Sequence, residues 1–174
     1  MQNLVLFGFM GTGKSLISKK MARVLRLERV DMDSIIEERQ KKSINDIFAE
    51  DGEPFFRELE RQLTIELSQK KDLIIATGGG VVLNEENIRN FSKSGVCVRL
   101  DTSAELIFER VKIHTHRPLL QTENPLQTIK TMLASREEQY AKVPYQVVTD
   151  NKSPDEVCSE IMEIYNNHTA FIFE

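Results

Sequence analysis

The sequence predicts an α/β fold with a five-stranded parallel sheet flanked by helices. Short apolar runs of β character alternate along the chain with longer segments of helical period, which is typical of such a sheet. Parallel strands need crossover connections, and the helical segments supply them. We expect strands at residues 4–7, 29–31, 73–77, 96–101 and 146–149.

Length and composition favour one domain, residues 1–174, because 174 residues suffice for a core and no linker is visible. A net charge of −4 gives no basic excess for nucleic acid. Cys97 and Cys158 are expected to be reduced core residues. The chain enters its first strand without a charged leader, and no apolar run approaches the roughly 20 residues that span a bilayer. We therefore expect a cytoplasmic protein without a membrane partner.

A glycine-rich stretch lies between the first expected strand and the following helix. Residues 8–15 have the sequence Gly-Phe-Met-Gly-Thr-Gly-Lys-Ser. Glycines let backbone N–H groups wrap around an anion, and the helix N-terminus adds positive potential. With this spacing, Lys14 reaches the β and γ phosphates of a nucleotide and the Ser15 hydroxyl becomes a Mg²⁺ ligand. The stretch is therefore predicted to be a nucleotide phosphate loop.

Asp31 and Asp33 follow the second expected strand, at the edge of the sheet where ligands bind in this class of fold. Two residues of extended chain place both carboxylates on one face. Facing the phosphate loop, one would hold Mg²⁺ through water and the other would accept a hydrogen bond from a substrate hydroxyl. The alternative for Asp33 is helix capping. Ser34 to Glu37 has the form of a capping box, so we expect Ser34 to supply the cap instead.

A short helix at residues 43–48 is expected to end near Gly52, and Pro54 then opens a longer helix. The expected core stripe of the longer helix recurs every fourth residue: Phe55, Leu59, Leu63 and Leu67. Arg57 lies nearly opposite that stripe. From spacing alone, a solvated face with an Arg57 to Glu60 or Arg61 to Glu58 ion pair is the favoured interpretation.

Three glycines, residues 78–80, follow the third expected strand. They either bring the main chain close to a ligand or make a sharp strand-to-helix turn, and the sequence does not decide between these. Residues 112–124 are polar and locally basic, and we predict a lid there, from which Arg117 would reach transferring phosphates. His114 and His116 are expected to be exposed loop residues.

Arg136 is the one anomaly in the next predicted helix. It falls on the apolar stripe of that helix, which consists of Leu126, Ile129, Leu133 and Tyr140. A charge directed inward must find a partner or protrude into a cleft. Snorkelling at the edge of the stripe is the alternative.

Taken together, these motifs resemble those of the shikimate kinases, small members of the nucleoside monophosphate kinase-like P-loop family. The resemblance covers nearly the whole chain, from about residue 4 to residue 164. Its carriers are the loop at 8–15, Asp31-Met-Asp33, the segment 56–60, Thr77-Gly-Gly-Gly80, Arg117-Pro-Leu-Leu120 and the segment 136–140. Thr12 replaces the alanine common in this loop, and the tail at residues 168–174 matches no family element.

The resemblance implies a three-layer P-loop kinase fold with a lid at about 112–124 and an acceptor-binding subregion at about 31–61. It implies ATP-dependent phosphorylation of shikimate to 3-phosphoshikimate, in the pathway to chorismate and aromatic amino acids, by a monomer. The implied ATP-binding residues are Gly11, Thr12, Gly13, Lys14, Ser15, Leu16, Arg110, Arg117 and Pro154, with Arg110 and Pro154 sandwiching adenine. For Arg110, a cation placed at a helix C-terminus is the structural alternative.

On the acceptor side, the resemblance implies that Asp33 binds and activates the hydroxyl. Arg57, Arg136 and the Gly79-Gly80 backbone would hold the carboxylate, which gives the inward Arg136 a reason and replaces the surface interpretation of Arg57. Lys14 and Arg117 would meet the phosphoryl group, while Ser15 and, through water, Asp31 would serve Mg²⁺. The rival functions are another small-molecule kinase, such as a gluconate or nucleotide kinase, and a regulatory nucleotide-binding module that transfers nothing.

Overall fold

Five short apolar runs form the strands of one parallel sheet in the computed structural model, which describes residues 2–112 and 122–170. The strands are β1 (Asn3–Phe7), β2 (Glu28–Asp31), β3 (Leu73–Ala76), β4 (Gly95–Asp101) and β5 (Tyr145–Val148). They lie in the order β2-β3-β1-β4-β5, and every pair is parallel. The predicted α/β fold is confirmed, with strand ends shifted by one residue.

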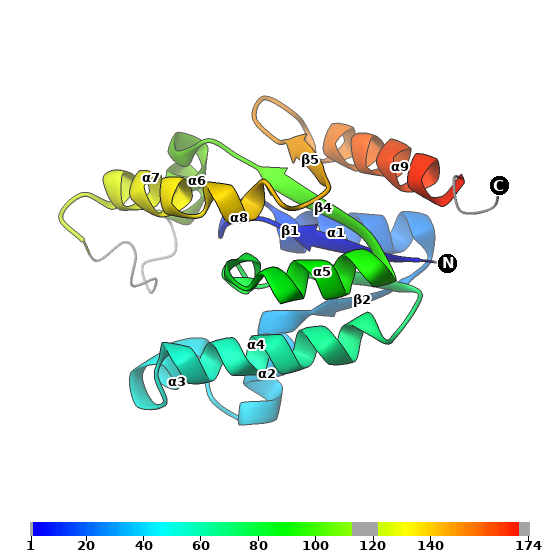
Figure 1. Cartoon of the computed structure of the whole chain (residues 1–174). Coiled ribbons are helices and arrows are strands. Elements are labelled where there is room, and N and C mark those ends of the chain that lie inside the picture. The colour runs from blue at the N-terminus through cyan, green and yellow to red at the C-terminus, as the bar shows by residue number, and fades with distance from the viewer. Residues whose placement is uncertain (1, 113–121, 171–174) are drawn as a thin grey trace.

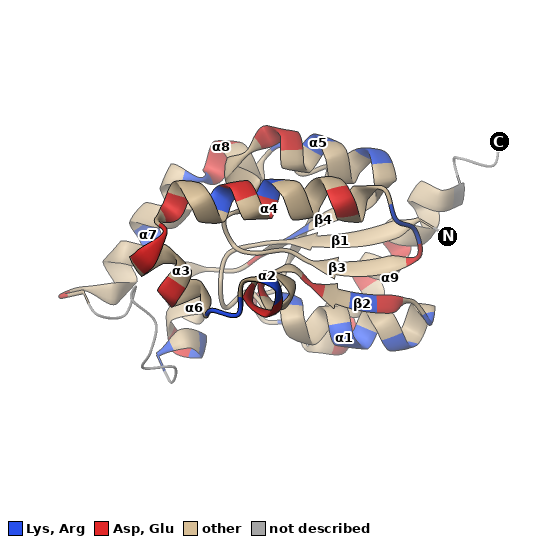
Figure 2. Cartoon of the chain, turned by 90° about the horizontal axis from the view of Figure 1, so that it is seen from below, with Lys and Arg blue, Asp and Glu red and all other residues tan. Residues whose placement is uncertain are grey.

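Helices cover both faces of the sheet in three layers (Figure 1). Seen from below, α4 and α5 lie above the strands, and α1 lies beneath them (Figure 2). The helices are α1 (Lys14–Leu25), α2 (Met32–Gln40), α3 (Ile44–Glu50), α4 (Glu53–Ser68), α5 (Glu85–Ser94), α6 (Ala104–Val111), α7 (Pro125–Ser135), α8 (Glu137–Tyr140) and α9 (Pro154–Ala170), with the 3₁₀ turn η1 (Val81–Leu83).

The central strand β1 is buried on both faces, as expected for a parallel sheet covered by helices. Because side chains alternate along a strand, Leu4 and Leu6 pack into the cluster between the sheet and helices α1 and α9. Val5 and Phe7 join the cluster between the sheet and helices α4 and α5. A third cluster joins Phe9 to α6 and α7, beyond the carboxyl ends of the strands. The free thiols Cys97 and Cys158 are buried, as predicted.

The predicted stripe of α4 is wrong at its first turn. Phe55 is 41% exposed, and Phe56 is buried in its place. A helix has 3.6 residues per turn, so a spacing of four drifts around the helix over several turns. The buried face is therefore formed by Phe56, Glu60, Leu63, Thr64 and Leu67.

Two expectations about helix ends are also wrong. The N-cap of α2 is Asp31 and the helix begins at Met32, so Ser34 is not the cap and Asp33 lies in the first turn. The expected continuous helix at residues 126–140 is interrupted at Arg136, whose backbone (φ −112°, ψ 2°) is not helical and separates α7 from α8.

Helix α9 extends through Ala170, so part of the unexplained tail is helical. Among the residues that the structure describes, no helix combines the length and apolar character needed to cross a bilayer.

Candidate active site

The phosphate loop connects β1 to α1 at the carboxyl edge of the sheet. Gly11 (φ 76°) and Gly13 (φ 101°) adopt the left-handed backbone that side chains disfavour, and Gly13 is the N-cap of α1. Thr12 is buried, and its hydroxyl donates to the Phe9 carbonyl at 2.8 Å, so its side chain points into the protein. The loop borders a pocket of about 520 Å³ whose wall also includes Asp31, Asp33 and Gly79.

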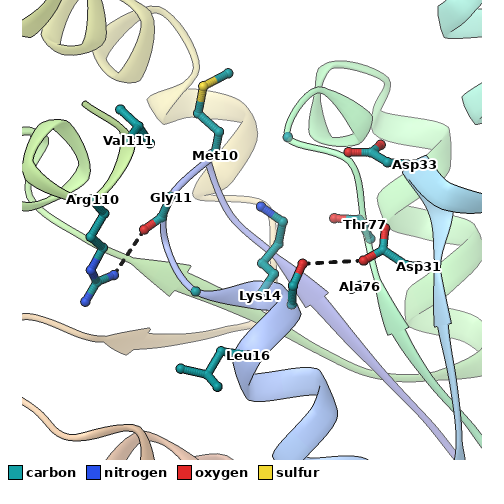
Figure 3. Close-up of a pocket in the computed structure, with 13 residues that line it drawn as sticks. Met10, Gly11, Lys14, Leu16, Asp31, Asp33, Ala76, Thr77, Arg110 and Val111 are labelled. Atoms are coloured by element: carbon teal, nitrogen blue, oxygen red, sulfur yellow. Dashed lines mark hydrogen bonds between the residues drawn. The ribbon is translucent and has the colours of Figure 1, made fainter. Parts of the chain in front are cut away.

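Lys14 points from the first turn of α1 into this pocket, on the side facing the two aspartates (Figure 3). Its ammonium group donates to the carbonyls of Gly8 at 2.6 Å and Phe9 at 2.8 Å. An ammonium group presents three donors on a flexible stem, so this folded-back position keeps the charge beside the loop and ready to turn toward an anion.

A hydroxyl and a carboxylate meet at the N-terminus of α1. Ser15 Oγ donates to Asp31 Oδ2 at 3.4 Å, and the same oxygen accepts from Arg29 Nη2 at 2.7 Å. Arg29 Nε in turn donates to Ser18 Oγ at 2.8 Å, which fixes the guanidinium. Arg29 therefore holds the Asp31 carboxylate toward Ser15.

These two oxygen-bearing side chains fit a hard divalent cation. Within the described ranges, no group of three or more His, Cys, Asp or Glu gathers as a metal cage. Mg²⁺ commonly takes only one or two protein oxygens and completes its octahedron with waters and phosphate oxygens. Ser15 and Asp31 supply such a partial set beside a phosphate loop.

Asp33 and Glu60 are two carboxylates that lie beside the glycine turn. Both lie so close to Gly78 that a Cβ there would be 2.6 Å from Asp33 Oδ1 and 2.7 Å from Glu60 Oε1. Burial raises the pKa of Asp33 above its ordinary value, although the Lys14 charge opposes the rise. Burial likewise raises the pKa of Glu60 to about 7, against the opposing charge of Arg57.

Arg57 lies between Glu53 and Glu60 on α4. It donates to Glu60 Oε2 at 2.5 Å and to Glu53 Oε1 at 2.8 Å, so the predicted Arg57 to Glu60 pair is present. The guanidinium also lies against the glycine turn, since a Cβ at Gly80 would be 2.0 Å from its Nη1. A side chain at Gly80 would displace the Arg57 guanidinium, so this contact depends on the glycine.

Arg136 reaches the same glycine turn from the junction of α7 and α8. Its Nη1 donates to the Gly79 carbonyl at 3.2 Å, and the Tyr140 hydroxyl donates to that oxygen at the same distance. The guanidinium carbon lies 5.5 Å from the centroid of the Phe9 ring, within the range of a cation–π contact. Arg57 and Arg136 thus converge on adjacent glycines, and the half-buried Arg136 has polar and aromatic partners there.

Arg110 and Pro154 meet on the other side of the phosphate loop. Both line a smaller pocket of about 200 Å³ together with Leu16, which is half exposed. Arg110 Nη1 donates to the Gly11 carbonyl at 3.1 Å (Figure 3). The contact explains how Arg110, near the end of α6, is directed at the loop rather than at its own helix terminus.

Arg117, with His114 and His116, lies outside the described residues, as does most of the predicted lid. The sequence analysis predicted Glu60 only as a solvated ion-pair partner of Arg57, whereas it is buried, and it gave Arg29 no role. A strict 3.6-residue period from Leu63 and Leu67 would have placed Glu60 on the buried face. The i, i+2 spacing from Arg29 to Asp31 would have placed both on one face of β2.

Comparison with known proteins identifies the family. The family model described as shikimate kinase matches residues 10–166. The shikimate kinase of Thermodesulfovibrio yellowstonii is 43% identical over 165 residues, which are 95% of each chain. The chain belongs to the shikimate kinase family. Most of the residues described above, including both arginines at the glycine turn, lie inside the matched range.

Solved structures agree with this membership. The shikimate kinase from Acinetobacter baumannii, solved in complex with shikimate, superposes with a TM-score of 0.90 at 32% identity, covering 97% of this chain and 94% of that one. A gluconokinase from Sinorhizobium meliloti superposes at a TM-score of 0.65 and 14% identity, over 99% of this chain and 95% of that one. The second likeness shows the shared P-loop kinase fold alone.

The titration of Glu60 should make the free energy of unfolding depend on pH. Its pKa is raised from 4.5 to about 7 in the folded protein, so the folded state holds a proton that the unfolded chain releases at lower pH. The stability from this group is fully present below pH 4.5 and is lost as pH rises through about 7. We expect Glu60→Gln to remove this loss, so that the variant gains up to about 3 kcal/mol relative to wild type across that interval.

Urea unfolding at a series of pH values measures the effect. Glu58→Gln is the matched control, because the Arg61 hydrogen bond lowers the pKa of the half-exposed Glu58 to about 2 and its titration lies below the tested interval. Parallel stability curves for wild type and Glu60→Gln would contradict the prediction.

Proposed function

We propose that this chain transfers the γ-phosphoryl group of ATP to a hydroxyl of shikimate, giving 3-phosphoshikimate for the synthesis of chorismate and aromatic amino acids. The observation that carries the proposal is the convergence of Arg57 and Arg136 on Gly79 and Gly80, beside the phosphate loop, where a Cβ on Gly79 would lie 3.4 Å from the Met10 backbone nitrogen. Family membership and the shikimate named for the A. baumannii structure support the choice of acceptor.

The donor half consists of the phosphate loop and its flanks. Backbone N–H groups from Gly11 to Leu16 at the start of α1 bind the β and γ phosphates, since a helix N-terminus and a glycine loop both favour anions. Lys14 swings from the loop carbonyls to the phosphate oxygens. Arg110 and Pro154 enclose the adenine ring in the smaller pocket.

Ser15 would hold Mg²⁺ directly and Asp31 would hold it through water. When bound, the metal would supply positive charge that offsets the charge of the phosphates. The contribution of this chain is to direct both oxygens to one point, and Arg29 does so by fixing the Asp31 carboxylate.

The acceptor half binds the shikimate carboxylate between two guanidinium groups. Two forks on opposite sides of a carboxylate make charge-assisted hydrogen bonds that fix its orientation as well as its position. Arg57 is already stacked against Phe56, at 5.4 Å from the ring centroid, and tied to Glu60, so little conformational freedom remains to be lost on binding.

Asp33 is the group that accepts the proton of the attacking hydroxyl. Its raised pKa makes it a better proton acceptor than an exposed aspartate once it is ionised, and Lys14 nearby favours that ionised form. Attack in line with the leaving oxygen of ADP then moves the phosphoryl group across the gap between the two halves. Catalysis consists mainly of positioning and charge neutralisation.

Residues 1–174 act as a single domain with an acceptor-binding subregion at about 31–61. A lid at about 112–124, which lies largely outside the described residues, closes over the phosphates and brings in Arg117 to stabilise transferred charge. The protein acts as a cytoplasmic monomer without nucleic-acid or membrane partners.

Release of ADP in a coupled assay tests the reaction. We expect turnover with ATP, Mg²⁺ and shikimate, and only background release without an acceptor. Gluconate should leave the rate at background, which separates this activity from that of a related small-molecule kinase. Equal release with and without shikimate would instead indicate a nucleotide-binding module that transfers nothing, and would refute the proposal.

Arg136→Ala is expected to raise the KM for shikimate by about 100-fold or more, since a charge-assisted bidentate contact contributes a few kcal/mol. The KM for ATP should change little. Steady-state kinetics with each substrate varied in turn measures both values. An unchanged shikimate KM would remove Arg136 from the acceptor site.

Asp31→Asn is expected to raise the Mg²⁺ concentration needed for half-maximal activity by about tenfold, because one anionic partner of the hydrated cation is lost. Binding of shikimate to the protein without nucleotide, measured by calorimetry, should be unchanged. A variant with the wild-type Mg²⁺ dependence would place the metal elsewhere.

A further inference from the structure

Arg99 is a buried charge that the proposed reaction does not use. It lies in β4, and only 6% of its surface is exposed. Alternation along the strand puts it on the same face as Cys97 and Asp101, opposite the face occupied by Val98 and Leu100. A guanidinium group at such a position is very costly unless its donors are satisfied, so its partners indicate what it does.

The principal partner of Arg99 is distant in the sequence. Nη1 and Nη2 donate to the two carboxylate oxygens of Glu137, each at 3.0 Å, in a bidentate pair that joins β4 to α8. Nη2 also donates to Asp101 Oδ1 at 3.0 Å. Gln146 of β5 donates to the other oxygen of Asp101 at 2.8 Å, so the Asp101 carboxylate is itself fixed to the sheet.

A second contact joins Arg99 to the same helix. Its guanidinium carbon lies 4.9 Å from the centroid of the Tyr140 ring, at cation–π distance. Arg99 therefore contacts both the first and the last residue of α8, which has only four residues. So short a helix has almost no stability of its own, and its orientation depends on these contacts.

The orientation of α8 determines where Arg136 points. Arg136 is the non-helical residue immediately before Glu137, and it donates to the Gly79 carbonyl that Tyr140 also contacts. Arg99 thus fixes Glu137, which follows Arg136 in the sequence, and Tyr140, which shares the Gly79 carbonyl with Arg136. Arg99 itself does not line the pocket at the phosphate loop.

We propose that Arg99, acting through Glu137 and Tyr140, is a positioning residue that holds Arg136 in the orientation needed to bind the carboxylate of the acceptor. The inference rests on the proposed function of Arg136. Under this proposal, the Arg99 guanidinium in the sheet sets the direction of the Arg136 guanidinium and so contributes to specificity for a carboxylate.

Glu137→Gln tests this proposal without leaving the buried Arg99 unpaired, because the ion pair between Arg99 and Asp101 remains. The amide keeps one acceptor and loses the bidentate charged pair. We expect the KM and the calorimetric Kd for shikimate to rise about tenfold, with kcat and the KM for ATP within about twofold of wild type.

Glu138→Gln is the matched control. It makes the same charge change one residue along, and Glu138 is exposed with no hydrogen bond or ion pair within the described ranges. We expect its shikimate Kd to match that of wild type. If Glu137→Gln and Glu138→Gln behave alike, or if Glu137→Gln weakens ATP and shikimate equally, the positioning role is refuted.

Arg99→Lys completes a double-mutant cycle. Lysine keeps the charge but cannot form the bidentate fork, so it should weaken shikimate to a similar extent. Combined with Glu137→Gln, it should add little, since both changes break one interaction. Additive effects on the shikimate Kd would refute the proposal, as would a loss of thermal stability with an unchanged Kd.

The same measurements separate this inference from the proposed function. If wild type shows no shikimate-dependent ADP release, the function itself fails. If Arg136→Ala weakens shikimate and Glu137→Gln does not, the function stands and only the role of Arg99 is lost.

Discussion

The site depends on one constraint of the parallel sheet, which is that every strand ends at the same edge. The loop after β1, Asp31 at the end of β2, and the glycines after β3 are brought together because β2, β3 and β1 are neighbours with a common direction. Backbone hydrogen bonds of the sheet thereby fix the relative positions of the phosphate loop, Asp31 and the glycine turn. Side-chain contacts then set the final orientation of each group, as Arg29 does for the Asp31 carboxylate.

Buried and half-buried charge is the second organising element. Glu60 and Arg99 are buried, Arg57 and Arg136 are half-buried, and each is joined to a neighbour by a polar contact. Glu60 is the most costly of them, since its Oε1 has no hydrogen-bond partner among the described residues and its pKa is raised to about 7. An unsatisfied buried carboxylate of this kind lowers the stability of the fold, and such groups are typical of sites whose geometry serves binding.

The sequence was sufficient for the fold and for the donor half because both rest on local patterns. Strand, glycine loop and helix are contiguous, and their spacing carries the chemistry. Arg136 was also recognisable, because a charge on an apolar stripe is a local anomaly. The break in the helix at that residue was not, since it depends on the glycine turn 57 residues away in sequence. Arg99 escaped notice because β4 is buried on both faces, where alternation carries little information, and Glu137 lies 38 residues further on.

Strands β2 and β4 flank the central β3–β1 pair and end in the same way. Each carries an arginine two residues before its terminal aspartate and bonded to it, Arg29 with Asp31 and Arg99 with Asp101. The protein has a net charge of −4, and two uncompensated carboxylates at this edge would repel a triphosphate on approach. The paired arginines cancel that repulsion from within the strands. An acidic protein can thus present an electrostatically permissive entrance to a polyanion without a basic surface.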